Sequence, residues 1–244
     1  MNRFAAIIEA RMTSSRLPKK VLKKILGKPT LELMIERLRQ VQGLNDIIIA
    51  STSNVSDDPI AELGNSLGVS VWRGSEDDVL GRVVEAALAF DVDVIVETTG
   101  DCPLIDPQLV DQGISTFQNN TADCVSNAFI PTYPLGMDYY IVPTALLAAS
   151  AELAKEPSER ENVIRYIKWH PADYQHLNLP AAPEHTFPNL MLTLDYQEDF
   201  DLIQAIFERL YPTKPDFDLN DILALMKQKP NLAKINAHLR KPRI

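Results

Sequence analysis

Residues 4–22 read FAAIIEARMTSSRLPKKVL. The apolar run at the start of this stretch predicts a buried first strand. The rest predicts a loop, because Pro18 interrupts regular structure among two arginines, three hydroxyl residues and two lysines. Fixed cations and small hydrogen-bond donors at the carboxyl end of a strand form an anion site. The stretch therefore predicts a phosphate-binding loop and favours nucleotide chemistry.

The first half of the chain alternates strand-like and helix-like segments. Such alternation is typical of a parallel sheet with crossover helices. We expect strands over residues 4–9, 46–51, 69–72 and 93–96, and helices over residues 30–41, 57–67, 79–90 and 107–117.

The second half is less regular. We expect strands over residues 123–125 and 190–194, and a strand or hairpin across a pocket within 131–142. Helices are expected over residues 145–154, 159–169, 198–210, 220–228 and 232–239. The basic end at residues 240–243 is expected to be a solvated tail. No repeat or linker interrupts the chain, so residues 1–244 are expected to form a single domain.

Composition narrows the class of protein. The formal net charge is −9, which argues against nonspecific nucleic-acid binding. No apolar run is long enough to span a membrane, and the first residues do not resemble a signal peptide. The two cysteines and four histidines lack metal-ligand spacing. We therefore expect a cytoplasmic enzyme that binds neither nucleic acid nor membrane.

Two carboxylates follow apolar segments and are candidates for metal ligands. Asp101 comes after residues 93–96 with Gly100 before it, and Asp195 comes after residues 190–194. Mg²⁺ commonly takes one or two carboxylates and fills its shell with phosphates and water. Asp195 could equally cap the helix that follows it, whereas Asp106 suits a capping role before Pro107. The residues alone leave the role of Asp195 open.

The ordered motifs resemble one enzyme family. They are ARMTSSRLPKK (residues 10–20), RGSEDDVLGR (73–82), GDCPL (100–104), GMD (136–138), ERE (159–161) and TLDYQEDF (193–200). Together they resemble the cytidylyltransferases that make CMP-activated sugars. The branch typified by the spore coat polysaccharide biosynthesis protein SpsF is the most similar.

The resemblance implies a fold and a reaction. The fold would be a Rossmann-like, GT-A-like nucleotidyltransferase with three αβα layers around a mostly parallel sheet. The single domain would contain a less regular acceptor-binding part around residues 127–185. The reaction would transfer CMP from CTP to a sugar acid or related acceptor and release pyrophosphate, in surface polysaccharide or glycan synthesis. A homodimer exchanging the segment 131–146 would be compatible with it.

The resemblance also assigns residues. Mg²⁺ would be held by Asp101 and Asp195, and the residues central to catalysis would be Arg11, Lys20 and Asp101. The nucleotide would be bound by Ala10, Arg11, Ser14, Ser15, Arg16, Lys20, Arg82, Thr99 and Gly100. The acceptor would be bound by Asp138, Tyr140, Arg160 and Asn162.

Four positions depart from the branch pattern. Glu97 stands where arginine is usual, Tyr140 where glutamate is usual and Asn162 where histidine is usual. Met191 replaces a basic residue. Three of the departures, at Tyr140, Asn162 and Met191, fall in the half expected to contact the acceptor, so we expect CTP binding to be kept and the acceptor to differ.

Two other functions stay open. A GT-A-like glycosyltransferase would usually present an Asp-x-Asp metal motif, and this chain has two, at residues 91–93 and 216–218. Both lie where structural roles are expected, before a strand and at a helix start. A noncatalytic homologue would bind the nucleotide without releasing pyrophosphate.

Overall fold

The computed structural model describes residues 2–239, and the basic residues 240–243 lie outside this range. Its strands are β1 (Phe4–Glu9), β2 (Lys24–Ile25), β3 (Lys28–Pro29), β4 (Asp46–Thr52), β5 (Ser70–Gly74), β6 (Val94–Thr99), β7 (Cys124–Ser126), β8 (Tyr140–Pro143) and β9 (His176–Asn178). Its α-helices are α1 (Thr30–Leu38), α2 (Asp58–Leu67), α3 (Val79–Ala89), α4 (Pro107–Gln118), α5 (Thr144–Leu153), α6 (Pro157–Arg160), α7 (Arg165–Trp169), α8 (Gln197–Leu210) and α9 (Leu219–Gln228). Within the described residues no helix is long and apolar enough to cross a bilayer.

The main sheet has the order β5-β4-β1-β6-β8-β7-β9. Neighbouring strands are parallel except at β8, which runs antiparallel to both β6 and β7. The predicted, mostly parallel sheet is thus confirmed. Strands β2 and β3 form a separate small hairpin.

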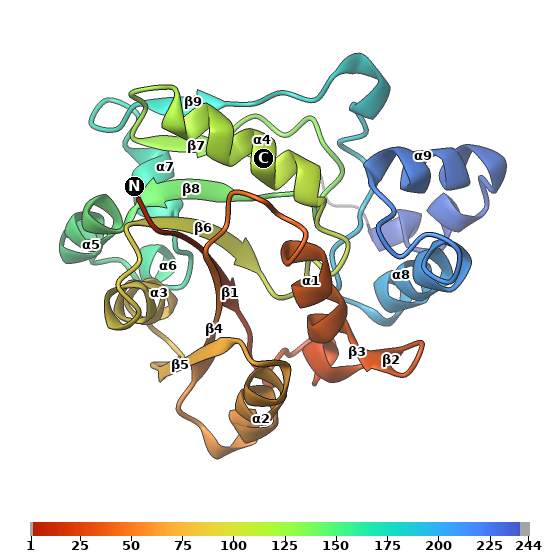
Figure 1. The fold of residues 1–244 in the computed structure, drawn as a ribbon, viewed down its shortest axis with the longest axis horizontal. Helices are drawn as coiled ribbons and strands as arrows, with labels where there is room; N and C mark the ends of the chain where they lie inside the picture. Colours follow the sequence, from red (N-terminus) through yellow and green to blue (C-terminus); the bar gives the residue numbers. More distant parts are fainter. Residues whose placement is uncertain (1, 240–244) are drawn as a thin grey trace.

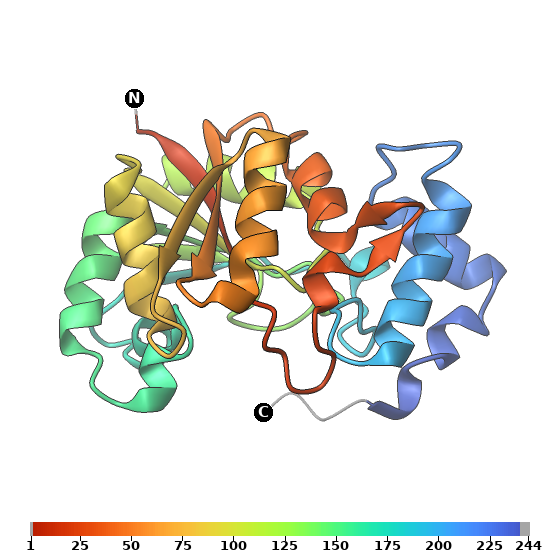
Figure 2. The same ribbon diagram turned by 90° about the horizontal axis from the view of Figure 1, so that it is seen from below.

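Helices cover both faces of the sheet (Figure 1). Alternate residues of β1 point to opposite faces, so Ala6 and Ile8 pack against α1, α2 and α4, whereas Ala5 and Ile7 pack against α3, α5 and α7. The result is the expected three-layer αβα arrangement. A third apolar cluster joins α8 and α9, which lie at the opposite side of the molecule from α5 in both views (Figures 1 and 2).

The predicted strand at residues 190–194 is wrong. Leu192 donates its backbone N–H to the Leu135 carbonyl at 2.8 Å, but Leu194 donates to the Asp101 carbonyl at 2.8 Å. The segment therefore changes partner within two residues, and only a single bridge between Leu135 and Met191 forms. Its leucines are nonetheless buried. The alternating pattern correctly reports burial, but no neighbouring strand continues beside it.

Two predicted helices are also wrong in part. The helix expected over residues 159–169 is split into α6 and α7, and the turn between them buries both Val163 and Ile164. Instead of a helix over residues 232–239, the chain forms two 3-10 turns, Leu232–Lys234 and Ala237–Leu239. Between these turns Asn236 is buried and donates to Met191 and Asp199, which ties the end of the described chain to α8.

Candidate functional site

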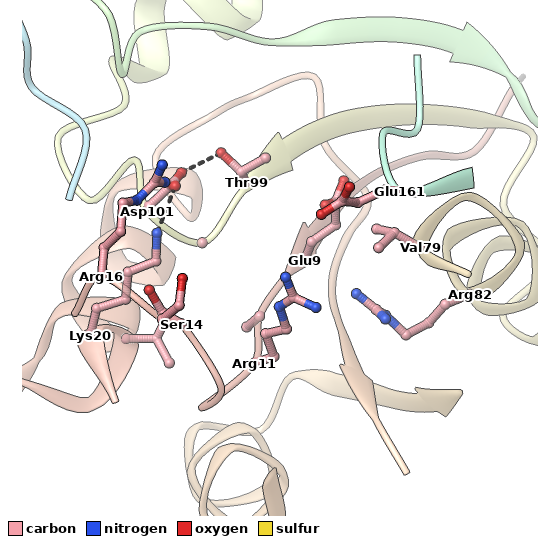
Figure 3. Close-up of a pocket in the computed structure, with 14 residues that line it drawn as sticks. Glu9, Arg11, Ser14, Arg16, Lys20, Val79, Arg82, Thr99, Asp101 and Glu161 are labelled. Carbon is pink, nitrogen blue, oxygen red and sulfur yellow. Dashed lines mark hydrogen bonds and ion pairs between the residues drawn. The ribbon is translucent and has the colours of Figure 1, made fainter. Parts of the chain in front are cut away.

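A cavity of about 340 Å³ opens where β1 and β6 end (Figure 3). This is the carboxyl edge of parallel strands, where open α/β sheets bind ligands. All of the predicted nucleotide-binding residues line it, namely Ala10, Arg11, Ser14, Ser15, Arg16, Lys20, Arg82, Thr99 and Gly100, and so does the predicted metal ligand Asp101. The remaining lining residues are Glu9, Val21, Val79 and Glu161.

The loop after β1 is fastened at several points. Met12 donates its N–H to the buried Asp57 carboxylate at 2.9 Å, and Lys19 donates its N–H back to the Met12 carbonyl at 3.0 Å. Gly100 approaches β1 closely, since its N–H contacts the Glu9 carbonyl at 2.8 Å and an added Cβ would lie 2.7 Å from that oxygen. The chain that leaves β6 therefore needs glycine at this position in order to lie against the end of β1.

One end of the cavity gathers Ser14, Arg16, Lys20 and Asp101, and we name it the phosphate end. Lys20 Nζ lies 2.8 Å from Asp101 Oδ2 and 2.9 Å from Asp195 Oδ1. Arg16 Nη2 lies 2.7 Å from the same Asp195 oxygen. The carboxylates of Asp101 and Asp195 thus converge, although only Asp101 follows a strand of the sheet, and they meet on the Lys20 ammonium.

The charges at this end are fixed by their pairing. Burial alone would lower the pKa of Lys20, but Asp101 and Asp195 outweigh it and raise that pKa above its ordinary value. For Asp101, burial favours protonation, but the Lys20 charge and hydrogen bond hold the pKa of the carboxyl below its ordinary value. Thr99 adds a hydrogen bond to Asp101 of 2.5 Å. Both groups are therefore charged around neutral pH.

The donor set at this end fits a magnesium ion. Asp101 and Asp195 both contact one cationic nitrogen, so they are close enough to share a small cation. Within residues 2–239 no three Asp, Glu, His or Cys side chains gather into a ready-made metal cluster. Two carboxylates with the remaining ligands supplied by phosphate and water are what Mg²⁺ commonly takes.

The other end of the cavity is formed by Glu9, Val79, Arg82 and Glu161, and we name it the acidic end (Figure 3). Glu9 shares a hydrogen bond with Glu97, which is 6% exposed. Burial raises the pKa of Glu97 well above its ordinary value, and the nearby charge of Glu9 raises it further. Burial also raises the pKa of Glu9. Burial lowers the pKa of Arg82.

Some predicted residues do not line the cavity: Asp138, Tyr140, Arg160, Asn162 and Asp195. Asp195 lies at its margin, bound to Lys20 and Arg16. Arg160 points elsewhere, donating to the Ala151 carbonyl at 2.6 Å and pairing with Asp78 at the start of α3. Tyr140 lies beside Glu97 in the sheet register. The acceptor roles of Asp138, Tyr140, Arg160 and Asn162 stay predictions, and so does the metal-binding role of Asp195.

Sequence reasoning missed Glu9 and Glu161. Glu9 is the last residue of an apolar strand and was interpreted only as part of that strand. A carboxylate at the carboxyl end of a buried strand could nonetheless have indicated a residue of the site. Glu161 lies between two residues predicted to bind the acceptor, but its place depends on the turn after α6. That turn directs Glu161, rather than Arg160, into the cavity.

Both Asp-x-Asp sequences have structural roles. Asp93 accepts a hydrogen bond from the Arg3 N–H at 2.7 Å, beside a turn in which Asp91 has a φ of 52°. Asp218 caps α9 by accepting from the Asp221 N–H at 3.0 Å. Neither pair lines the cavity, so the feature expected of a glycosyltransferase site is not built from them.

Known proteins share this fold and much of this sequence. The cytidylyltransferase family model matches residues 5–232. The spore coat polysaccharide biosynthesis protein SpsF of Bacillus subtilis is 32% identical, covering 96% of this chain and 98% of the relative. An uncharacterised protein of Methanocaldococcus jannaschii is 35% identical, with 98% and 96% covered.

A solved cytidylyltransferase structure, from Leptospira borgpetersenii, superposes with a TM-score of 0.90 at 29% identity, covering 96% of this chain and 97% of the other. The structure of CMP:2-keto-3-deoxy-manno-octonic acid synthetase with CTP covers 85% of this chain and 99% of the other; it has a TM-score of 0.62 at 18% identity, a likeness of fold. This chain therefore belongs to the cytidylyltransferase family, the enzymes that transfer a cytidylyl group.

Proposed function

We propose that this enzyme transfers CMP from CTP to a sugar acid or related acceptor in polysaccharide or glycan synthesis. The observation that carries the proposal is the convergence of Arg16, Lys20, Asp101 and Asp195 at the phosphate end. The relatedness to SpsF, whose name refers to spore coat polysaccharide, supports the place in metabolism. The 3-deoxy-manno-octulosonate cytidylyltransferase of Geobacter sulfurreducens, 34% identical over 49% of this chain and 47% of its own length, supports a sugar-acid acceptor.

The residues divide the work by their chemistry. The triphosphate is bound by Arg11, Ser14, Ser15, Arg16 and Lys20. Guanidinium groups can donate two hydrogen bonds at once to phosphate oxygens, the lysine ammonium is a compact positive charge, and the serine hydroxyls are small donors. An acceptor oxygen forms a bond to the α-phosphorus while the bond to the pyrophosphate oxygen breaks. Positioning and charge neutralisation account for such a transfer, so the protein needs no nucleophile of its own.

Asp101 and Asp195 would hold Mg²⁺, which when bound neutralises phosphate charge. Lys20 contacts both carboxylates, and an ammonium bound to the triphosphate there would neutralise charge that develops on the leaving pyrophosphate. The Lys20 side chain is 13% exposed, so its neighbours restrict its conformational freedom and keep bulk water from most of its surface. The phosphate end thus has its cations in position before the nucleotide arrives.

The test is pyrophosphate release measured with CTP, UTP, ATP and GTP. Each nucleotide is combined with nonulosonic acids, 3-deoxy-manno-octulosonate (Kdo) and phosphonates as acceptors. We expect release with CTP and Mg²⁺, and none when EDTA removes the metal. If CTP binds but no acceptor leads to pyrophosphate release, the result would instead favour a noncatalytic homologue. Release with UTP or ATP but not CTP would overturn the proposed donor.

A further inference from the structure

The acidic end of the cavity holds carboxyl groups that form no ion pair with a cation of the described chain, although the charges of Arg82 and Arg11 act on Glu9 from farther away. Among the ion pairs within residues 2–239, none includes Glu9, Glu97 or Glu161. Glu9 and Glu161 line the cavity, and Glu97 backs Glu9 through their shared hydrogen bond. This contrasts with the phosphate end, where Asp101 and Asp195 both contact Lys20.

Arg82 provides a second, independent sign that a ligand belongs at this end. It is 2% exposed, and its Nη1 donates to the carbonyls of Ser75 and Glu76. Its Nε is buried and has no hydrogen-bond partner among the described residues. A buried donor without an acceptor is costly, so this N–H calls for an oxygen that the described part of the chain does not supply.

The location identifies which substrate would fill this end. Glu97 lies beside Tyr140 in the β6–β8 register, and the charge of Asp138 acts on the Glu97 carboxyl. Glu161 follows α6 directly. These are the segments expected to bind the acceptor. A triphosphate is matched better by Arg16 and Lys20 at the phosphate end than by Glu9 and Glu161 here, although Arg11 and Arg82 lie beside Glu9 (Figure 3).

We propose that the acceptor carries a free amino group, held as an ammonium by Glu9 and Glu161 with Glu97 behind Glu9, and an oxygen that accepts from Arg82 Nε. This rests on the proposed cytidylyl transfer and names its acceptor class: an amino-substituted sugar acid or an aminoalkyl phosphonate. An ammonium has three N–H donors and can serve several carboxylates at once. A purely anionic acceptor would satisfy Arg82 but would add negative charge beside Glu9 and Glu161.

Matched pairs of acceptors test the proposal. Kdo is compared with its 8-amino analogue, and hydroxyethylphosphonate with aminoethylphosphonate, in pyrophosphate release with CTP and Mg²⁺. In a pair that is turned over, we expect kcat/KM to be about tenfold or more higher for the amino member, because an unfilled polar site rejects the analogue that lacks the group. Equal or better use of the hydroxyl member overturns the proposal.

Calorimetry with CTP present covers the case in which no probe is turned over. Tighter binding of the amino members then supports the proposal, and equal or weaker binding overturns it. The proposed function fails separately: if CTP itself does not bind or react, cytidylyl transfer is lost whichever acceptor is preferred.

Variants locate the effect at the acidic end. Glu9→Gln and Glu161→Gln keep the size of the side chain, and we expect each to bring the amino-to-hydroxyl ratio down by at least about fivefold while the KM for CTP changes less than twofold. Glu85→Gln on α3, which faces Trp72 rather than the cavity, is the matched control. A rise in the KM for CTP with an unchanged ratio would overturn the proposal, because these carboxyls would then contact the nucleotide.

Discussion

At the phosphate end of the cavity, the Lys20 ammonium contacts two carboxylates, whereas at the acidic end Glu9 and Glu97 face each other. Pairing at the first end moves the pKa of Asp101 down and that of Lys20 up. Burial at the second end moves the pKa values of Glu9 and Glu97 up. The same cavity therefore holds carboxylates that contact a cation of the protein beside carboxyl groups with which the described residues form no ion pair.

The two ends therefore differ in whether their polar groups already have partners before a ligand binds. The phosphate end is complete in the protein alone, since its cations are already oriented and a triphosphate or metal exchanges one set of charged partners for another. The acidic end gains partners only when a ligand arrives, because Arg82 Nε lacks an acceptor among the described residues. Substitutions at the first end should therefore damage catalysis, and substitutions at the second should change selectivity or stability.

The largest effect is expected from Asp101→Asn, which keeps the shape but removes the charge that Lys20 and Mg²⁺ would share. We expect kcat/KM for CTP to fall about 10³-fold, in the range of other losses of transition-state charge stabilisation. Pyrophosphate release measures it. Asp216→Asn, exposed before α9, is the control. Activity of Asp101→Asn within threefold of the unmodified enzyme would contradict the assignment of Asp101 as metal ligand.

Arg16→Ala should have the next effect. Arg16 contacts Asp195 at 2.7 Å and lies over the Tyr196 ring, with its guanidinium carbon 5.4 Å from the ring centre. Loss of a hydrogen bond from a charged group costs about 1.5–3 kcal/mol. We therefore expect kcat/KM for CTP to fall about 10- to 150-fold. The exposed Arg209→Ala on α8 should leave steady-state rates unchanged. If both variants behave alike, Arg16 has no part in phosphate binding.

Glu76→Ala tests how the phosphate loop is held in place. Glu76 accepts from Asn54 Nδ2 at 2.5 Å, contacts Thr13 Oγ1, and lies 3.7 Å from Arg11 Nη1. These contacts are partly exposed, so each is worth about 0.2–1 kcal/mol. We expect the KM for CTP to rise about two- to fivefold with little change in kcat. The exposed Glu62→Ala on α2 serves as control, and a fall in kcat alone would contradict a positioning role.

The sequence predicted the paired end of the cavity better than the unpaired one. The largely apolar strand at residues 4–9, the cationic loop and Asp101 after β6 are local patterns, and the sheet edge brings them together. Asp195 could be placed only through the resemblance, because residues 190–194 are not a strand of the sheet. Their hydrogen bonds to Leu135 and Asp101 join distant parts of the chain.

The acidic end depends on contacts that no local pattern encodes. Glu9 meets Glu97 because β1 and β6 are neighbours, and Glu161 enters the cavity because α6 stops at Arg160. The preference of residues 159–169 for helix gave no sign of this stop. Glu97 was recognised as a departure from the branch pattern, but its partner became known only from the strand order.

The smallest effect concerns the stability cost of the acidic end. The pKa of Glu97 is raised by burial and then by Glu9, so the folded state holds the proton more tightly than the unfolded state. Above the unfolded pKa of about 4.3, unfolding releases this proton, and the stability of the enzyme should fall as pH rises toward the folded pKa. Below that window the Glu97 contribution is constant.

Glu97→Gln removes the titrating group but keeps a side chain that can donate to Glu9. We expect the Tm of the variant, relative to the unmodified enzyme, to increase between pH 4.5 and pH 8, by about 2–4 °C for each kcal/mol recovered. Thermal unfolding followed by circular dichroism across this range measures it, with Glu62→Gln as control. Parallel curves would mean that Glu97 is ionised in the folded enzyme without penalty, and the contrast between the two ends of the cavity would then rest on geometry alone.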